Sequence, residues 1–152
     1  MNKHSALPHQ TLYDSDYYLW SERQAALLRQ GKLTLLDIEN LAEEIESLGK
    51  SDRRALMSQV QRLLVHLLKW QFQRPRRSES WRKSIQMARD AMSRIVEDSP
   101  SLRDAIAKRL ENEFKLARRN ASRETKLPES DFPAQCPYSL QQIMDDDFLP
   151  ES

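Results

Sequence analysis

The stretch SDRRALMSQVQRLLVHLLKWQF, residues 51–72, decides the fold class of this chain. Its apolar residues recur three and four positions apart, as they do on the buried face of an α-helix, and they cover a very broad arc of the helix surface. An arc of this width is typical of a central helix that is buried on most sides. Ser51 can cap the start of this helix and Pro75 stops it, so the sequence predicts a central helix over residues 51–72.

Two shorter helices are predicted before the central one. The first has Asp14 or Ser15 as its N-cap and ends at Gly31, because glycine readily adopts the left-handed conformation that commonly closes a helix. The second starts at the N-cap Asp37 and ends before Gly49. Its apolar residues follow the helical spacing and form a stripe of Ile38, Leu41, Ala42, Ile45 and Leu48.

Two more helices are predicted after the central one. The first of them begins at Ser78 or Ser80 and carries a narrower apolar stripe. The other covers about residues 100–124, with Ser99 as its N-cap and Pro100 in the first helical position, where proline's missing amide hydrogen costs nothing.

Five helices with short connections and no internal repeat predict an all-α fold, a compact helical bundle. Residues 127–152 contain four of the seven prolines and predict an irregular tail that wraps the bundle, with one short helix near residues 139–144. The expected anchors of the tail are Phe132, Tyr138, Ile143 and Phe148. Residues 1–12 show no periodicity and are interpreted as a flexible leader or arm, which leaves residues 13–152 as a single helical domain.

Composition narrows the class of protein further. Cys136 is the single cysteine, so no internal disulfide can form, and no apolar stretch has the length of a signal peptide core or of a membrane span. We therefore expect a soluble, cytoplasmic protein that makes no membrane contact. The net charge of +1 excludes a global electrostatic attraction to nucleic acid, and any electrostatic function has to come from local clusters.

One such cluster is acidic and lies on the helix that follows Asp37. At about 100° per residue, Glu39, Glu43 and Glu46 share one flank, while Glu44 lies across the apolar stripe. Three aligned carboxylates could bind Mg²⁺ or Mn²⁺, or could dock a basic partner. A solvated acidic face explains them equally simply and is favoured, so we expect neither a metal nor another cofactor.

His66 lies at the edge of the apolar arc of the central helix. A lone histidine in this position is most often hydrogen-bonded at a helix seam. For catalysis its ring needs an acidic partner, and the candidate catalytic residues are Glu43, Glu44, His66 and Lys69. The common catalytic templates are absent from the sequence, which makes an enzyme the less favoured interpretation.

The sharpest local charge feature is KWQFQRPRRSESWRK, residues 69–83, with six basic residues, one acidic residue and interleaved aromatic residues. Basic side chains neutralise phosphates, and exposed aromatic rings stack on bases in proteins that bind single strands. The candidate nucleic-acid contacts are Arg74, Arg76, Arg77, Arg82 and Lys83. The same aromatic rings also suit core positions at helix ends, so nucleic-acid binding is possible but not favoured.

Nearly the whole chain resembles a known family. The motifs LYDSDYYLW, LDIENLAEEIESLG, HLLKWQFQ, SWRKSI, ARRNASRETKLP and DDDFLP occur in this order, and over about residues 12–150 they look like bacterial domain-of-unknown-function family twenty-nine. The resemblance implies a small all-α bacterial protein with no established activity, and it supplies no catalytic residues. The family's recurring signatures fall on Asp37, Asn40, Leu41, Glu43, Glu44, Glu46, His66, Lys69, Trp70, Ser80 and Trp81. The stretch Arg74–Arg77 varies within the family pattern.

Three functions remain open after the sequence has been read. The favoured one is a helical protein-interaction or regulatory module that binds a protein partner or a second copy of itself through an acidic or apolar helix face. The first alternative is nucleic-acid binding through residues 69–83. The second is a metal-assisted or acid–base enzyme that uses the carboxylates of residues 43–46 with His66.

Overall fold

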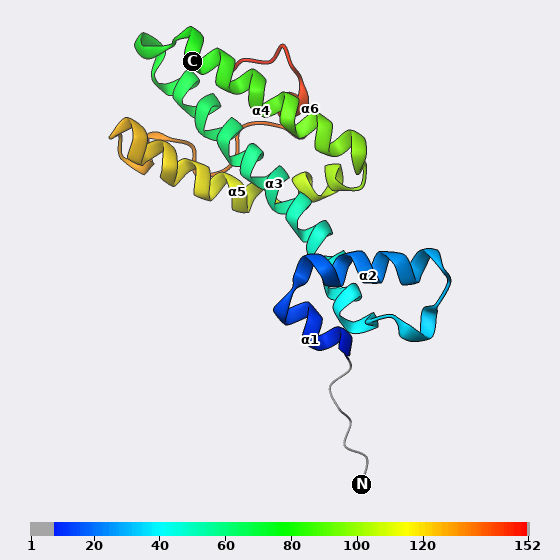
Figure 1. Ribbon diagram of the computed structural model, residues 1–152. Coiled ribbons are helices and arrows are strands. Elements are labelled where there is room, and N and C mark those ends of the chain that lie inside the picture. Colours follow the sequence, from blue (N-terminus) through cyan, green and yellow to red (C-terminus); the bar gives the residue numbers. More distant parts are fainter. Residues whose placement is uncertain (1–7, 152) are drawn as a thin grey trace. The chain divides into compact units, whose positions relative to one another are not determined.

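The computed structural model describes residues 8–151, and the regular secondary structure of this part of the chain is entirely helical (Figure 1). The all-α prediction is confirmed. In chain order the α-helices are α1 (Pro8–Ser15), α2 (Tyr17–Arg29), α3 (Ile38–Phe72), α4 (Glu79–Asp98), α5 (Leu102–Thr125) and α6 (Leu140–Met144). Short 3-10 helices are η1 (Leu33–Leu35), η2 (Arg74–Arg76) and η3 (Glu129–Asp131). None of the helices within residues 8–151 is both long and apolar enough to span a bilayer.

The packing of the described residues divides the chain after Lys50 into two compact units, the first ending at Lys50 and the second beginning at Ser51. The first unit contains α1, α2, η1 and the first part of α3. The second contains the remainder of α3 together with α4, α5, α6 and the tail. The whole hydrophobic core cluster comes from the second unit, because a bundle of long helices can enclose many side chains.

The start of the first unit differs from the prediction. The helix predicted to begin after Asp14 or Ser15 is α2, but its N-cap is Asp16, whose carboxylate accepts a hydrogen bond from the Leu19 amide at 3.0 Å, and an additional helix, α1, precedes it. The leader predicted over residues 1–12 lies outside the described residues up to position 7, and from Pro8 onward the chain is helical. Gly31 follows α2 with a φ of 70°, so the predicted left-handed helix end is confirmed.

The predicted helix boundary at Gly49 and Ser51 is wrong. A single helix, α3, runs through both residues, and Gly49 does not have the positive φ of a helix-ending glycine. A glycine inside a helix costs only about 1 kcal/mol relative to alanine, which is too little to end a helix with good helix formers on both sides. The predicted end of the helix is confirmed, since α3 stops at Phe72, just ahead of Pro75.

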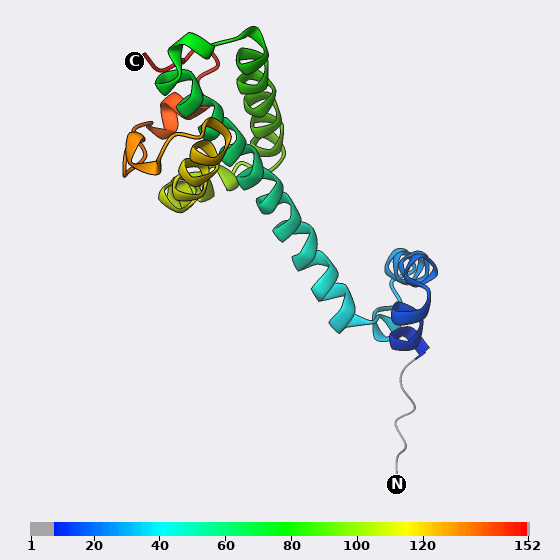
Figure 2. The ribbon, with the colours of Figure 1, turned by 90° about the vertical axis from the view of Figure 1, so that its left-hand side faces the viewer.

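In the second unit, α4 and α5 flank the long helix α3, and the chain after α5 returns along the same bundle (Figures 1 and 2). The broad apolar arc of residues 51–72 is buried as predicted, and Leu56, Leu63 and Leu67 have no exposed surface. Ile85 and Met92 of α4 and Phe114 of α5 complete the core and are buried to a similar degree. The central-helix interpretation is therefore confirmed for this part of α3.

Two serines were predicted as N-caps of α4 and α5, with different outcomes. The Ser78 hydroxyl accepts from the Trp81 amide at 3.2 Å, so the predicted start of α4 is confirmed. Ser99 instead ends α4, where its amide donates to the Ile95 carbonyl, and α5 begins only at Leu102. The turn that joins these two helices takes up Pro100 and Ser101, which moves the start of α5 by two residues.

The tail after Thr125 packs on the bundle as predicted. Phe132, Tyr138 and Ile143 are buried, and Phe148 packs against the core. The short predicted helix is α6, whose Ser139 and Gln142 form a reciprocal capping box. Three backbone carbonyls of this region accept hydrogen bonds from the guanidinium of Arg89 in α4, which ties the tail to the bundle.

Candidate functional site

The first unit is organised around one buried polar network. The indole Nε1 of Trp20 donates to Oδ2 of Asp37 at 3.0 Å, and the Asn40 amide donates to the same oxygen at 2.8 Å. The backbone amide of Asp37 donates to the side-chain oxygen of Gln24 at 2.8 Å. A buried carboxylate is tolerated only when its acceptor positions are satisfied, so Asp37 holds α2 against the start of α3. This family-signature residue has a structural role.

Glu44 also has a structural role in the first unit. Its two carboxylate oxygens accept hydrogen bonds from the hydroxyl groups of Tyr13 and Tyr17, the latter at 2.7 Å. These bonds stabilise the charged carboxylate and lower the pKa of Glu44, while they raise the pKa of Tyr13 to about 12. Glu44 therefore stays ionised and engaged at neutral pH, which is a poor state for a general acid.

The other acidic residues of the α3 start are exposed. They are Glu39, Glu43 and Glu46. Among the described residues, no group of three or more histidine, cysteine, aspartate or glutamate side chains is placed to hold a metal ion. The three glutamates therefore do not form the ligand set that Mg²⁺ or Mn²⁺ requires.

The apolar stripe of α3 lies on the surface of the first unit rather than in a core. Ile38, Ile45 and Leu48 are 67%, 68% and 68% exposed. Among the described residues, nine of the twelve exposed large hydrophobic side chains belong to residues 17–48, although this segment is a small part of the chain. Scattered exposed leucines need no explanation, but an exposed stripe on one helix face marks a contact surface.

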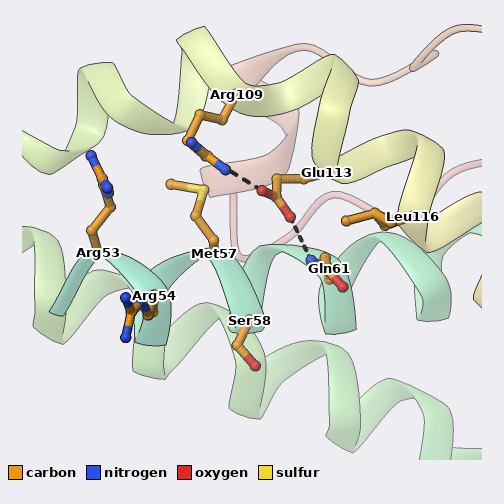
Figure 3. A pocket seen from close by; sticks show the side chains of 8 residues that line it. All are labelled: Arg53, Arg54, Met57, Ser58, Gln61, Arg109, Glu113 and Leu116. Carbon is orange, nitrogen blue, oxygen red and sulfur yellow. Dashed lines mark hydrogen bonds and ion pairs between the residues drawn. The ribbon is translucent and has the colours of Figure 1, made fainter. Parts of the chain in front are cut away.

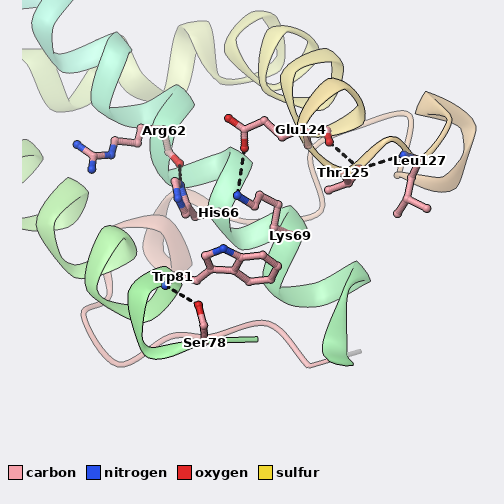
Figure 4. A network of polar contacts seen from close by, with 9 residues as sticks. Arg62, His66, Lys69, Ser78, Trp81, Glu124, Thr125 and Leu127 are labelled. Atoms are coloured by element: carbon pink, nitrogen blue, oxygen red, sulfur yellow. Dashed lines mark hydrogen bonds and ion pairs between the residues drawn. The ribbon is translucent and has the colours of Figure 1, made fainter. Parts of the chain in front are cut away.

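The predicted histidine lies in the second unit, within a polar cluster that joins three helices (Figure 4). Nδ1 of His66 is 2.8 Å from the Arg62 carbonyl, so Nδ1 carries the proton and the ring is held against its own helix. Lys69 forms an ion pair with Glu124 at 3.1 Å, and its ammonium lies 4.8 Å from the centre of the Trp81 ring. The cluster thus brings together His66, Lys69 and Trp81, with Glu124 as their acidic neighbour.

The electrostatics of this cluster favour a structural role. Burial, together with the charges of Lys69 and Arg62, lowers the pKa of His66, so the ring is neutral at pH 7. The carboxylate whose charge acts on His66 is Glu124. Acid–base catalysis by His66 with Glu43 or Glu44 stays a prediction.

The basic-aromatic segment is mostly engaged within the second unit. Trp70 is 8% exposed, and the guanidinium groups of Arg77 and Arg82 lie 5.0 and 5.4 Å from its ring centre. The Arg77 Nε also donates to the Trp70 carbonyl at 2.8 Å. A ring covered in this way cannot stack on a base, which removes one of the aromatic rings that a single strand could use. The remaining basic candidates are exposed: Arg74, Arg76 and Lys83.

Sequence reasoning missed a group of arginines between α3 and α5. Arg53 and Arg54 of α3 and Arg109 of α5 line one cavity of about 400 Å³ in the second unit. Nothing in the local pattern around Arg53 points to a partner more than fifty residues later, because such pairing depends on how the two helices pack. The adjacent pair Arg53 and Arg54 is the one feature of this group that the sequence itself displays.

Comparison with known proteins identifies a family and no characterised relative. The family model described as "Domain of unknown function DUF29" matches residues 12–149. No curated protein and no solved structure matches the chain. Any functional assignment therefore has to come from the surfaces and contacts of this chain itself.

Proposed function

The chain belongs to the DUF29 family, and from the surface of its first unit we propose that it is a protein-interaction module that forms a homodimer through the start of α3. The observation that carries the proposal is the exposure of Ile38, Ile45 and Leu48 on one face of that helix. Leaving three large aliphatic side chains in water forgoes about 1.5–3 kcal/mol each. A second copy that covers this face recovers that free energy.

The spacing of the stripe matches a helix–helix contact. Residues 38, 41, 45 and 48 stand in the a and d positions of a heptad, which is the pattern of helices that pack lengthwise. Ala42 in the stripe and Gly49 beside it are small residues, and no atom of the described residues beyond the helix's own backbone lies within 4 Å of the place where a Cβ on Gly49 would be. Small residues beside an apolar seam allow a second helix to come close.

The proposed occupant is a second copy of this helix, because a twofold contact pairs residue i with j and j with i and so sets the apolar face of one copy against that of the other. Glu46 and Lys50 fall at the outward b and f positions of the same heptad and lie outside the seam. Where the two helices meet at Leu48, this residue faces its own copy.

Replacing Leu48 with glutamate tests the stripe. The full chain is expected to scatter light with twice its mass of 17.9 kDa, and Leu48→Glu is expected to return it to the mass of one chain, because the new charges would face each other in the seam. Leu28→Glu is the matched control, since Leu28 is also an exposed leucine but belongs to α2. A wild-type chain of single mass, or equal dissociation by both variants, contradicts the proposal.

A further inference from the structure

We propose that the cavity between α3 and α5 in the second unit is a binding site for a small phosphate-bearing molecule with an apolar part. Arg53 and Met57 enter the cavity from α3, while Arg109, Glu113 and Leu116 enter it from α5 (Figure 3). Its volume of about 400 Å³ lies within the range of small-molecule sites in proteins. The site is independent of the α3 stripe proposed as the dimer contact.

The carboxylate of Glu113 lies at the buried end of the cavity and already has partners within the chain. Glu113 is 3% exposed, its Oε2 accepts a hydrogen bond from Nε2 of Gln61, and its Oε1 lies 3.4 Å from Nε of Arg109. A buried carboxylate needs such partners, so these contacts explain Glu113 and the orientation of Arg109. The outer part of the Arg109 side chain stays 46% exposed and can still receive a ligand.

The other two arginines of the cavity, Arg53 and Arg54, are not positioned by contacts of this kind. Among the described residues, no ion pair or hydrogen bond engages the guanidinium groups of Arg53 and Arg54. A neighbouring cavity of about 470 Å³ shares Arg53 and Arg109 as walls and adds Lys108. Together the two cavities hold four cations against Glu113 and Asp104, within a unit that has nineteen basic and fifteen acidic residues. The excess positive charge is left for an outside anion.

The residues that line the cavity determine which class of ligand it can bind. Guanidinium groups bind phosphate oxygens in pairs of parallel hydrogen bonds, which makes arginine the usual side chain of phosphate sites. Met57 and Leu116 form the apolar part of the wall, which suits a base or another flat group attached to the phosphates. The arginines surround one cavity instead of following a track along the surface. This arrangement favours a small ligand over a nucleic-acid strand.

Calorimetric titration of the full chain tests the site, with adenosine diphosphate, inorganic pyrophosphate and a single-stranded oligonucleotide as probes. We expect adenosine diphosphate to bind more tightly than pyrophosphate, because it also fills the apolar wall. Arg53→Ala should weaken its binding about tenfold or more, since each lost charge-assisted hydrogen bond pair is worth at least that factor. Arg103→Ala, on α5 but outside both cavities, should leave the affinity unchanged.

The outcomes can be distinguished because no ion pair or hydrogen bond engages Arg53 in the part of the chain that the structure describes, so its loss should leave the fold intact. Absence of heat with both phosphate probes overturns the proposal, as does an equal affinity of the Arg53→Ala and Arg103→Ala variants. Binding of the oligonucleotide alone, with a steep loss at higher salt, also overturns it and indicates a nucleic-acid surface instead. None of these results depends on whether the chain is a dimer.

Discussion

Replacing Arg89 with alanine is expected to release the C-terminal tail and to lower the free energy of unfolding of the second unit by about 3–5 kcal/mol. Arg89 is 2% exposed, and its guanidinium donates to the carbonyls of Ile143, Phe148 and Gln142 at 3.0, 2.8 and 3.1 Å. Without it, three carbonyl groups lose their donor, and a cavity replaces the side chain.

The measurement is urea unfolding followed by tryptophan fluorescence, combined with limited proteolysis of the tail. Arg94→Ala is the matched control, because Arg94 lies on the same helix, is exposed, and makes a single long contact of 3.4 Å to the Asp90 carbonyl. That variant should change the stability by less than about 0.5 kcal/mol. Equal stability of the Arg89 and Arg94 variants contradicts the assigned role of Arg89.

Replacing Trp20 with alanine should unfold the first unit and leave the second one folded. Among residues 12–50 only Trp20, Gln24 and Asp37 are buried, so the indole is the main apolar contribution to this small core. Its loss costs about 3–5 kcal/mol and also leaves the buried Asp37 without one of its donors. A unit with so small a core cannot absorb such a loss.

Circular dichroism and fluorescence together distinguish the two units. The variant should lose the helical signal of the first unit, while the two remaining tryptophans, Trp70 and Trp81, keep their native emission because both lie in the second unit. Tyr18→Ala is the control, since Tyr18 is 74% exposed on the same helix. Full helicity in the Trp20 variant, or loss of the native emission of Trp70 and Trp81, refutes this account of the first unit.

Helix ends that depend on neighbouring residues could be predicted from the sequence. Ser78 caps α4 through the amide three residues on, and Gly31 closes α2 through its own backbone conformation. Gly49 could not be assigned in the same way, because a glycine ends a helix only when the chain beyond it turns away. The N-cap prediction at Ser99 was wrong for a related reason, since the same residue type can end one helix or begin the next.

The candidate binding surfaces could not be predicted in full, because they depend on how the helices pack against one another. The spacing of Ile38, Ile45 and Leu48 predicted one apolar face, but only the structure shows that no described residue of the first unit covers that face. Glu44 and His66 were visible as chemically capable groups, while their tyrosine and carbonyl partners are set by tertiary contacts. Arg53 and Arg109 share a cavity only because α3 and α5 pack together.

Disulfide formation at position 48 tests the proposed dimer most directly. In a twofold pair of α3 helices that meet at Leu48, this residue faces its own copy, at a separation that a disulfide can bridge. In a Cys136→Ser background, which removes the only native thiol, Leu48→Cys should therefore form a disulfide-linked dimer on mild oxidation. Leu28→Cys, exposed on α2, should stay a single chain under the same conditions. A Leu48→Cys chain that cross-links no faster than the Leu28→Cys chain would contradict the account.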